Sequence, residues 1–159
     1  MILETAAERR TLIDRARTIA MVGASANPAR PSYFVFSYLR TRGRFELTPI
    51  NPTISAIDGI RAYPSLRAYA AEHGAPDIVD VFRRPEETPQ ISREAVEIGA
   101  RAIWFQYGVV NDEAIRIADE AGLDVVVDRC LKVETARFDG NLALGGVNTG
   151  LLTAKRRIH

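Results

Sequence analysis

The chain has 159 residues, of which 47% are hydrophobic and 26% charged, so we expect one globular domain and exclude disordered and fibrous classes. Lys plus Arg number 21 and Asp plus Glu 20, and the net charge of +1 gives no general attraction to nucleic acid or to anionic membranes. The single cysteine, Cys130, excludes an internal disulfide, and two histidines without a Cys/His cluster give no basis for a metal site.

No segment carries the ~18 consecutive apolar residues of a membrane span. The first twenty residues mix acidic and basic side chains and lack the apolar core of a secretory signal. Together these features predict a cytoplasmic protein that does not enter a membrane.

Helical and strand patterns alternate along the chain. Residues 2–17 carry apolar side chains at helical spacing and predict a first amphipathic helix. Short apolar runs predict five buried strands, at residues 18–22, 45–50, 77–82, 102–105 and 124–127. Helices are expected between them, at residues 32–42, 65–72, 88–98 and 111–122, with Ser65, Thr88 and Asn111 as N-caps.

This alternation predicts right-handed crossovers and a parallel sheet covered on both faces. The expected fold class is α/β, a Rossmann-like doubly wound domain of five strands in the order 3-2-1-4-5. Residues 1–138 would form this domain, with residues 1–17 as its N-terminal helix, and residues 139–159 a tail of uncertain structure. In that order the ligand crevice lies between the first and fourth strands, at their carboxyl ends.

The loop after the first strand, residues 23–32, is the first candidate for a ligand site. Gly23 permits a tight turn and close approach of the backbone. Ser25, Ser32 and the N–H groups at the start of the next helix are suited to a phosphate, and Arg30 adds a positive charge. The alternative is an ordinary strand-to-helix turn in which Ser32 is only an N-cap.

The same loop does not match the dinucleotide fingerprint. Ser25 and Pro28 stand where G-x-G-x-x-G requires glycine. The second strand ends in Asn51-Pro52-Thr53 and offers no acidic residue to a ribose. Both departures disfavour NAD.

Several blocks of sequence closely resemble the small stand-alone CoA-binding domain proteins, which are related to the CoA-binding domain of the succinyl-CoA synthetase alpha subunit. These blocks are VGASANPARPSYFVFSYLRTRG, PINP, DIVDVFRRPEE and AIWFQYGVVNDEAIRIADEAGLDVVVDRCLK, and they extend from residue 18 to residue 134. The resemblance implies a Rossmann-like fold that binds coenzyme A. Carried over by position, it implies phosphate contacts at Gly23, Ala24, Ser25, Arg30, Pro31 and Ser32, an adenosine site at Asn51 and Pro52, and flanking contacts at Phe82, Arg83 and Arg84.

The charges at the expected strand ends support this ligand independently. Coenzyme A carries a 3′-phosphate on its ribose, which an acidic residue after the second strand would repel, and none stands there. The third strand instead ends in Arg83-Arg84. The alternative for this pair is a solvated turn before Pro85.

The sequence offers no catalytic set that can be placed at one strand end. His73 is expected to cap a helix, whereas Gln106 and Tyr107 could line the crevice. Cys130, between Arg129 and Lys132, could be a thiolate stabilised by positive charge that forms a mixed disulfide with coenzyme A. The alternative is a semi-buried cysteine without chemistry.

The function expected is a non-catalytic module that binds or senses coenzyme A or acyl-CoA. The alternative is a nucleotide-dependent enzyme, either an NAD(P) reductase or an acyl-CoA-handling activity, that uses the same crevice. A third possibility is an interaction protein with a vestigial pocket.

Overall fold

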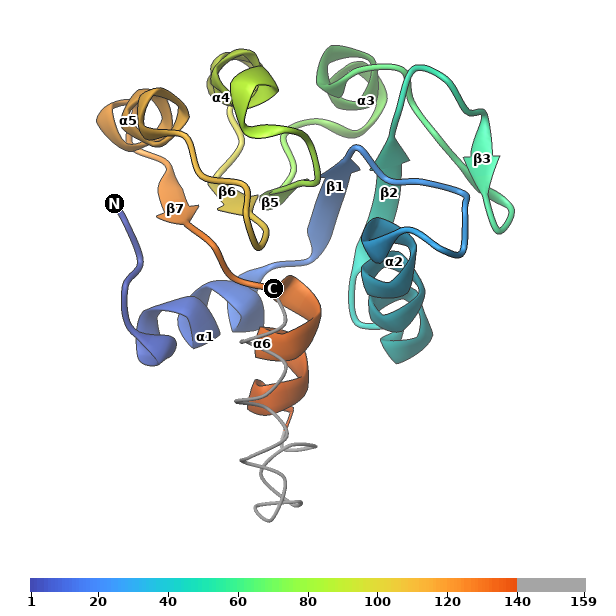
Figure 1. Ribbon diagram of the computed structural model, residues 1–159, viewed down its shortest axis with the longest axis horizontal. Helices are drawn as coiled ribbons and strands as arrows, with labels where there is room; N and C mark the ends of the chain where they lie inside the picture. Colours follow the sequence, from blue (N-terminus) through green and yellow to red (C-terminus); the bar gives the residue numbers. More distant parts are fainter. Residues whose placement is uncertain (140–159) are drawn as a thin grey trace.

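The computed structural model describes residues 1–139, which form a central sheet covered by helices on both faces (Figure 1). All five strands of this sheet run parallel, and their order is β2-β1-β5-β6-β7. Their bounds are β1 Thr18–Val22, β2 Glu46–Ile50, β5 Ile78–Val81, β6 Ala102–Phe105 and β7 Asp124–Val126. The α/β Rossmann-like fold class is therefore confirmed.

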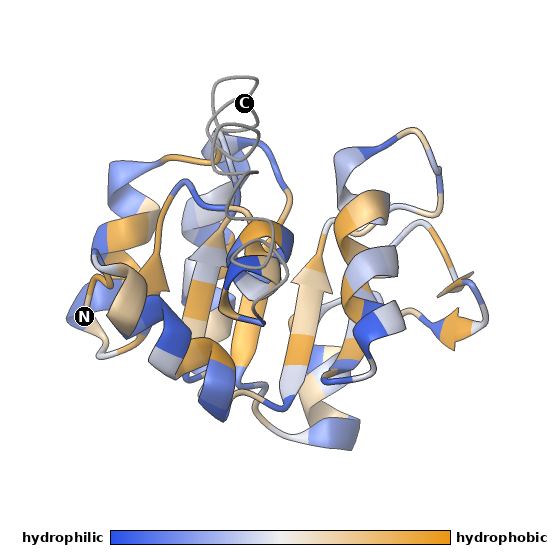
Figure 2. Ribbon diagram, turned by 90° about the horizontal axis from the view of Figure 1, so that it is seen from below, coloured by the Kyte–Doolittle hydropathy of each residue, from blue (hydrophilic) through white to orange (hydrophobic). Residues whose placement is uncertain are grey.

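Three helices cover each face of the sheet (Figure 1). One face carries α3 (Leu66–His73), α4 (Thr88–Glu97) and α5 (Asp112–Glu120), and the other carries α1 (Ala6–Arg15), α2 (Pro31–Arg42) and α6 (Leu131–Phe138). A short hairpin of β3 (Ala56–Ile57) and β4 (Ile60–Arg61) follows β2, and the 3-10 turn η1 (Pro85–Glu87) precedes α4. Figure 2 shows the result of this layering, since hydrophobic strands lie between helices that are mostly hydrophilic on the outside.

The expected strand order 3-2-1-4-5 is wrong, because β2 lies at the edge of the sheet and β5 lies between β1 and β6. Pro49 in β2 gives the physical reason. Proline cannot donate to a strand ladder and is confined to edge strands. Every residue of β5 is buried, as a central strand requires. The observed order is 2-1-3-4-5 in the numbering of the expected strands, so the switch point falls between β1 and β5.

Two of the expected N-caps are confirmed and one is wrong. The side chain of Ser65 accepts a hydrogen bond from the N–H of Ala68, and that of Asn111 accepts one from Ala114. Thr88 instead is the first residue of α4, fully buried, and its hydroxyl donates to the carbonyl of Pro85 at 2.6 Å. The turn η1 supplies the entry to this helix, so no side-chain cap is needed.

The first residues of the chain are extended and not helical as expected. Ile2 pairs in parallel with Val125, so the segment before α1 adds a short bridge to the β7 edge of the sheet. The helix begins only after Thr5, whose side chain forms a capping box with Glu8.

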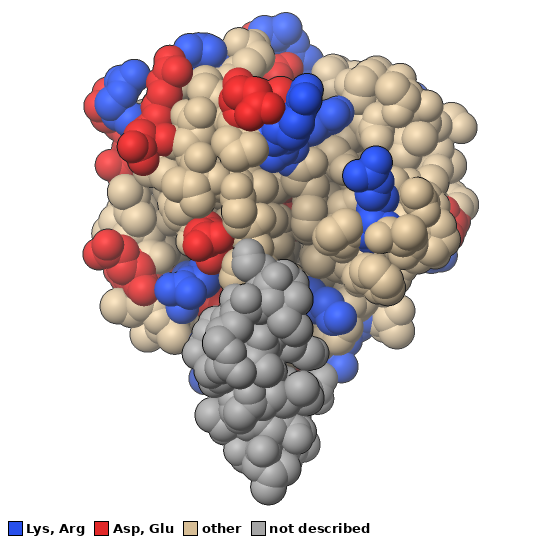
Figure 3. All heavy atoms as spheres, viewed as in Figure 1, with Lys and Arg blue, Asp and Glu red and all other residues tan. Residues whose placement is uncertain are grey.

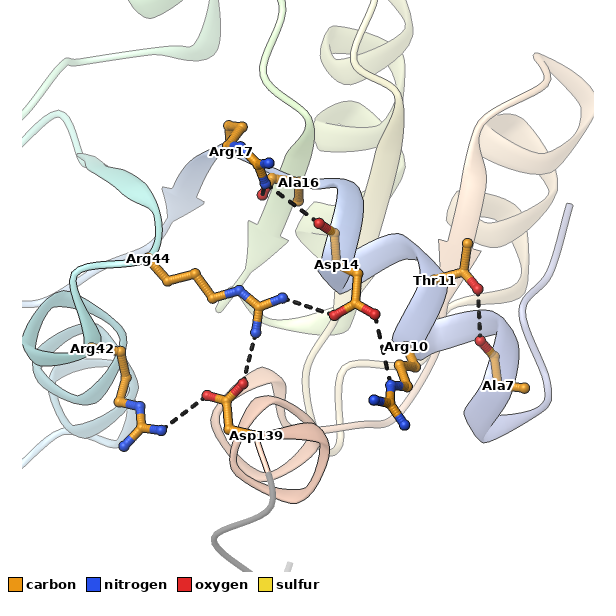
Figure 4. A network of polar contacts seen from close by, with 9 residues as sticks. All are labelled: Ala7, Arg10, Thr11, Asp14, Ala16, Arg17, Arg42, Arg44 and Asp139. Carbon is orange, nitrogen blue, oxygen red and sulfur yellow. Dashed lines mark hydrogen bonds and ion pairs between the residues drawn. The ribbon is translucent and has the colours of Figure 1, made fainter.

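Helix α6 was not expected, and two sets of contacts hold it in place. In its middle, Glu134 forms a buried ion pair with Arg9 of α1. After its last turn, Asp139 accepts hydrogen bonds from Arg44 at 2.7 Å and from Arg42 at 3.1 Å (Figure 4). Arg44 also reaches Asp14 of α1 at 2.8 Å, so one guanidinium joins α1, α6 and the segment before β2. Of the tail expected at residues 139–159, Asp139 is the C-cap of α6, and residues 140–159 lie outside the described residues.

None of the helices within residues 1–139 combines the length and apolar character that crossing a bilayer requires.

Gly23 is where the fold tolerates no side chain. It has φ +86°, and a Cβ built there would overlap the carbonyl oxygen of Phe82. We expect Gly23→Ala to lower the free energy of unfolding by more than ~3 kcal/mol, since it combines left-handed strain with a backbone clash between β1 and β5. Gly43→Ala is the matched control, with φ +66° and no atom within 4 Å of its Cβ, and should cost only ~1–2 kcal/mol. Urea denaturation of both variants measures the difference, and equal losses would contradict the clash.

Candidate functional site

A cleft of about 1000 Å³ opens at the carboxyl ends of β1, β5 and β6, between the first turns of α2 and α6. We call it the switch-point cleft. It is lined by Gly23, Ser25, Arg30, Pro31, Ser32, Phe34, Val35, Asn51, Phe82, Arg83, Arg84, Glu87, Gln106, Tyr107, Val109, Cys130, Lys132 and Val133. The corrected strand order explains its position, because it lies over the β1/β5 switch point and not between the first and fourth strands of the expected order.

Nine of the eleven residues expected at the site line this cleft: Gly23, Ser25, Arg30, Pro31, Ser32, Asn51, Phe82, Arg83 and Arg84. The side chain of Ala24 is fully buried beneath the loop and does not face the cleft. Pro52 lies in an adjoining hollow of about 490 Å³, which shares Arg83 and Glu87 with the cleft.

The lining from α6, including Lys132 and Val133, could not be found from the sequence because that helix was not recognised there. Phe34 and Val35 were also missed. They sit in the first turns of α2, directly after the loop that was recognised, and their place in the cleft depends on how this helix packs.

The loop after β1 is held in shape by its own side chains. The N–H of Ser25 donates to the hydroxyl of Ser32 at 3.1 Å, and the N–H of Asn27 donates to the hydroxyl of Ser25 at 3.0 Å. The N-cap of α2 is Arg30, so the alternative in which Ser32 is only an N-cap is wrong. The Ser32 hydroxyl instead stabilises the loop by accepting the bond from Ser25. These bonds fix the shape of the loop where it lines the cleft.

Asn51 ties the end of β2 to this loop. Its Nδ2 donates to the carbonyl of Ala24 at 2.9 Å, while its Oδ1 accepts from the N–H of Thr53 at 2.9 Å. Both polar atoms of the Asn51 amide are thus engaged, and its bond to Ala24 fixes the loop after β1 relative to the end of β2.

The charged lining of the cleft is mainly cationic, with Arg30, Arg83, Arg84 and Lys132 against the single acid Glu87. Figure 3 shows basic side chains on both sides of the middle of this face, with acidic ones beside one of the groups. The four cations are not equally available to a ligand. Arg84 is 77% exposed and is paired with Glu87 at 3.0 Å. Arg83 is half-buried and, among the described residues, makes no hydrogen bond or close ion pair, although its charge also helps to lower the pKa of Glu87.

A buried carboxyl group lies behind the cleft, on β5. Asp80 is fully buried, its Oδ1 accepts a hydrogen bond from Nε2 of Gln106, and its Oδ2 has no partner in the described structure. Burial raises the pKa of Asp80 to about 7, and the bonds from Gln106 and the Val81 N–H only partly oppose that rise. Gln106 itself lines the cleft, so it connects the buried acid to the ligand site.

Cys130 lines the cleft at the N-terminus of α6. Burial raises the pKa of its thiol, and the N–H groups of Val133 and Lys132 only partly oppose this. The expectation that nearby positive charge stabilises a thiolate is therefore wrong for the protein without a ligand, because desolvation outweighs the charge of Lys132.

The fold is a Rossmann-like α/β domain with a mainly cationic cleft at its switch point. The sequence matches the family described as CoA binding domain over residues 17–136, and the chain belongs to that family. Within residues 1–139 no group of three or more His, Cys, Asp and Glu side chains is placed to hold a metal ion.

The chain is similar over most of its length to several proteins, two of them with solved structures. YneT, an uncharacterized protein of Bacillus subtilis (strain 168), is 39% identical over 130 residues, which cover 82% of this chain and 93% of YneT. A hypothetical protein from Pyrococcus horikoshii OT3 is 36% identical with a TM-score of 0.80, and the match covers 86% of this chain and 94% of that one. A Thermus thermophilus structure is 34% identical with a TM-score of 0.77, covering 85% and 99%.

Asp80 makes the stability of the protein depend on pH. Because its pKa is about 7 in the folded protein and ~3.9 in an unfolded chain, the folded state binds more protons between these values, and the free energy of unfolding falls as the pH rises through them. The Asp80→Asn variant cannot ionise at this position and should not lose stability in this way. Between pH 5 and pH 8 the free energy of unfolding of the wild type should therefore fall by ~2.5 kcal/mol relative to that of the variant. Urea denaturation of both proteins at the two pH values measures this, and a constant difference between them would show that Asp80 keeps an ordinary pKa.

Proposed function

We propose that this protein binds coenzyme A in the switch-point cleft and acts as a binding module without catalysis of its own. Membership of the CoA binding domain family supports the ligand. The observation that carries the proposal is the cleft of about 1000 Å³ at the switch point, with four cationic side chains and one acidic one. Coenzyme A is a long polyanion, and this is the place where doubly wound sheets bind nucleotides.

The pyrophosphate would lie on the loop after β1, where Ser25, Arg30 and Ser32 line the cleft. The adenosine would occupy the adjoining hollow beside Pro52, which opens from the same strand ends. Arg83 lines both spaces and has no ion-pair partner among the described residues, so it is the side chain best suited to the 3′-phosphate.

The remaining arm of the ligand would cross the ends of β5 and β6 toward α6. Along that path the lining becomes largely apolar, with Tyr107, Val109 and Val133. Such a lining accepts an alkyl chain as readily as the bare arm, so the same cleft would admit acyl-CoA. A role in sensing coenzyme A or its thioesters would follow from that.

Coenzyme A should bind more tightly than NAD. Asn51 follows β2, and both polar atoms of its amide are engaged. The diol of an NAD ribose would therefore meet no carboxylate at this position, and the 3′-phosphate of coenzyme A would meet no repulsion. Isothermal titration calorimetry with coenzyme A, acetyl-CoA, NAD, NADP and ATP compares the candidates directly. Equal or tighter binding of NAD would refute the proposal and favour a nucleotide-dependent enzyme.

Arg83→Ala should weaken binding of coenzyme A roughly tenfold or more, because a charge-assisted contact contributes ~1.5–3 kcal/mol. Binding of dephospho-CoA, which lacks the 3′-phosphate, should hardly change. Arg84→Ala is the matched control, since its guanidinium is exposed and already paired with Glu87, and it should cost little with either ligand. Equal losses for both ligands with Arg83→Ala would assign this arginine to the pyrophosphate.

A further inference from the structure

Gln106 is a buried polar side chain in the lining of the switch-point cleft. It directly follows β6, is only 3% exposed, and shares the lining with the apolar side chains of Val109 and Val133. Its Nε2 donates a hydrogen bond to Oδ1 of Asp80, which is fully buried on β5. Its Oε1 accepts no hydrogen bond from the described residues and is not shut off from solvent. The amide is therefore anchored through its nitrogen, and its oxygen is available to a ligand as an acceptor.

The strand register places Gln106 close to the expected phosphate loop. Val22 of β1 pairs with Val81 of β5, and Val81 pairs with Phe105 of β6. Gly23 and Gln106, which follow β1 and β6, therefore lie at the same level of the carboxyl edge. Two strand spacings, roughly 10 Å, separate them. A ligand whose phosphates lie on the loop after β1 reaches Gln106 after crossing the end of a single strand, β5.

We propose that Gln106 and Asp80 form a specificity-determining pair, in which Gln106 accepts a hydrogen bond from an amide N–H of the coenzyme A arm and Asp80 positions it. The arm carries two amide groups, so it offers N–H donors between its alkyl parts. This proposal rests on the proposed function, because the phosphates must first hold the ligand in the cleft.

Asp80 determines which atom of the Gln106 amide faces the cleft. An ionised carboxyl group can only accept hydrogen bonds, so it holds the nitrogen of Gln106 and disfavours the reversed amide. Asp80 pairs across the strands with Trp104, two residues before Gln106, and Trp104 packs in the core cluster shared with α2 and α6. The pair thus lies on the face of the sheet on which α2 and α6 border the cleft.

The cost of burying Asp80 also indicates a role beyond packing. Its Oδ2 has no hydrogen-bond partner in the described structure, although buried polar atoms are almost always satisfied. Within the described chain, Gln106 is the side chain that donates to this carboxyl group. A buried acid with this single side-chain partner is suited to orienting that partner.

An acceptor in a largely apolar lining discriminates between ligands. A ligand that offers no donor at this point would displace water from Oε1 without replacing its hydrogen bond, and an unsatisfied polar atom costs more than a bond contributes. An arm with an amide N–H is therefore preferred to a purely alkyl arm.

The test is isothermal titration calorimetry at pH 8 with coenzyme A and with adenosine 3′-phosphate 5′-diphosphate, which lacks the arm. At this pH Asp80, whose pKa is about 7, is mainly ionised. Gln106→Met keeps the length of the side chain and removes its amide, so it should weaken binding of coenzyme A roughly threefold to tenfold. Binding of the truncated ligand should not change. Equal losses for both ligands, or no loss for coenzyme A, would overturn the proposal.

Asp80→Asn tests the positioning role and carries the test if circular dichroism shows that Gln106→Met does not fold. An asparagine can donate to Oε1 of Gln106 and turn its nitrogen toward the cleft, so coenzyme A should bind at least threefold more weakly. Because Asp80 acts through Gln106, the double variant should bind as Gln106→Met alone does. Unchanged binding by Asp80→Asn, or additive losses in the double variant, would overturn the positioning role.

The two ligands separate this inference from the proposed function. If the wild-type protein binds neither ligand, the proposed function fails. If it binds both with equal affinity, the cleft holds the phosphates but gains nothing from the arm, and the inference about Gln106 alone is overturned.

Discussion

The close approach of Gly23 to the carbonyl of Phe82 determines the geometry of the whole carboxyl edge of the sheet. It occurs where β1 and β5 end side by side, and there is no room for a side chain between them. Because the two backbones meet there, the loop after β1 turns away toward α2, and Arg83, the residue after Phe82, comes to lie against Gly23. The backbone geometry of the protein itself thus requires glycine at this position.

The opposite wall of the cleft depends on a different interaction, the buried ion pair between Arg9 and Glu134. Such a pair contributes little net stability, but breaking it by removing one partner costs ~3–5 kcal/mol because a charge is left buried. A further hydrogen bond and a second ion pair complete the pairing, since Arg9 also donates to the carbonyl of Glu4 and Arg137 pairs with Glu134 at 3.4 Å. This arrangement fixes α6 in one position on α1, and with it the place of Cys130 in the lining of the cleft.

The sequence was sufficient for the fold class and for most element boundaries, because buried strands and capped helices leave local patterns. It misplaced β2 although Pro49 carried the information that this strand lies at an edge. It could not reveal α6 or the bridge at Ile2, since both are fixed by contacts with segments more than a hundred residues away in the chain, Arg9 with Glu134 and Ile2 with Val125. Local periodicity does not contain such contacts.

The candidate site divides in the same way. Its phosphate end consists of loops that directly follow strands, so position in the chain was enough to identify Ser25, Arg30 and Arg83 as candidates. Its other end depends on burial, which changes the chemistry of residues that look ordinary in sequence. Asp80 reads as one acid in an apolar strand, yet complete burial moves its pKa to about 7. Cys130 reads as a thiol between two cations, yet desolvation outweighs them. The cleft thus combines exposed cationic side chains with a buried thiol in its lining and a buried carboxyl group behind it, and burial raises the pKa of both groups.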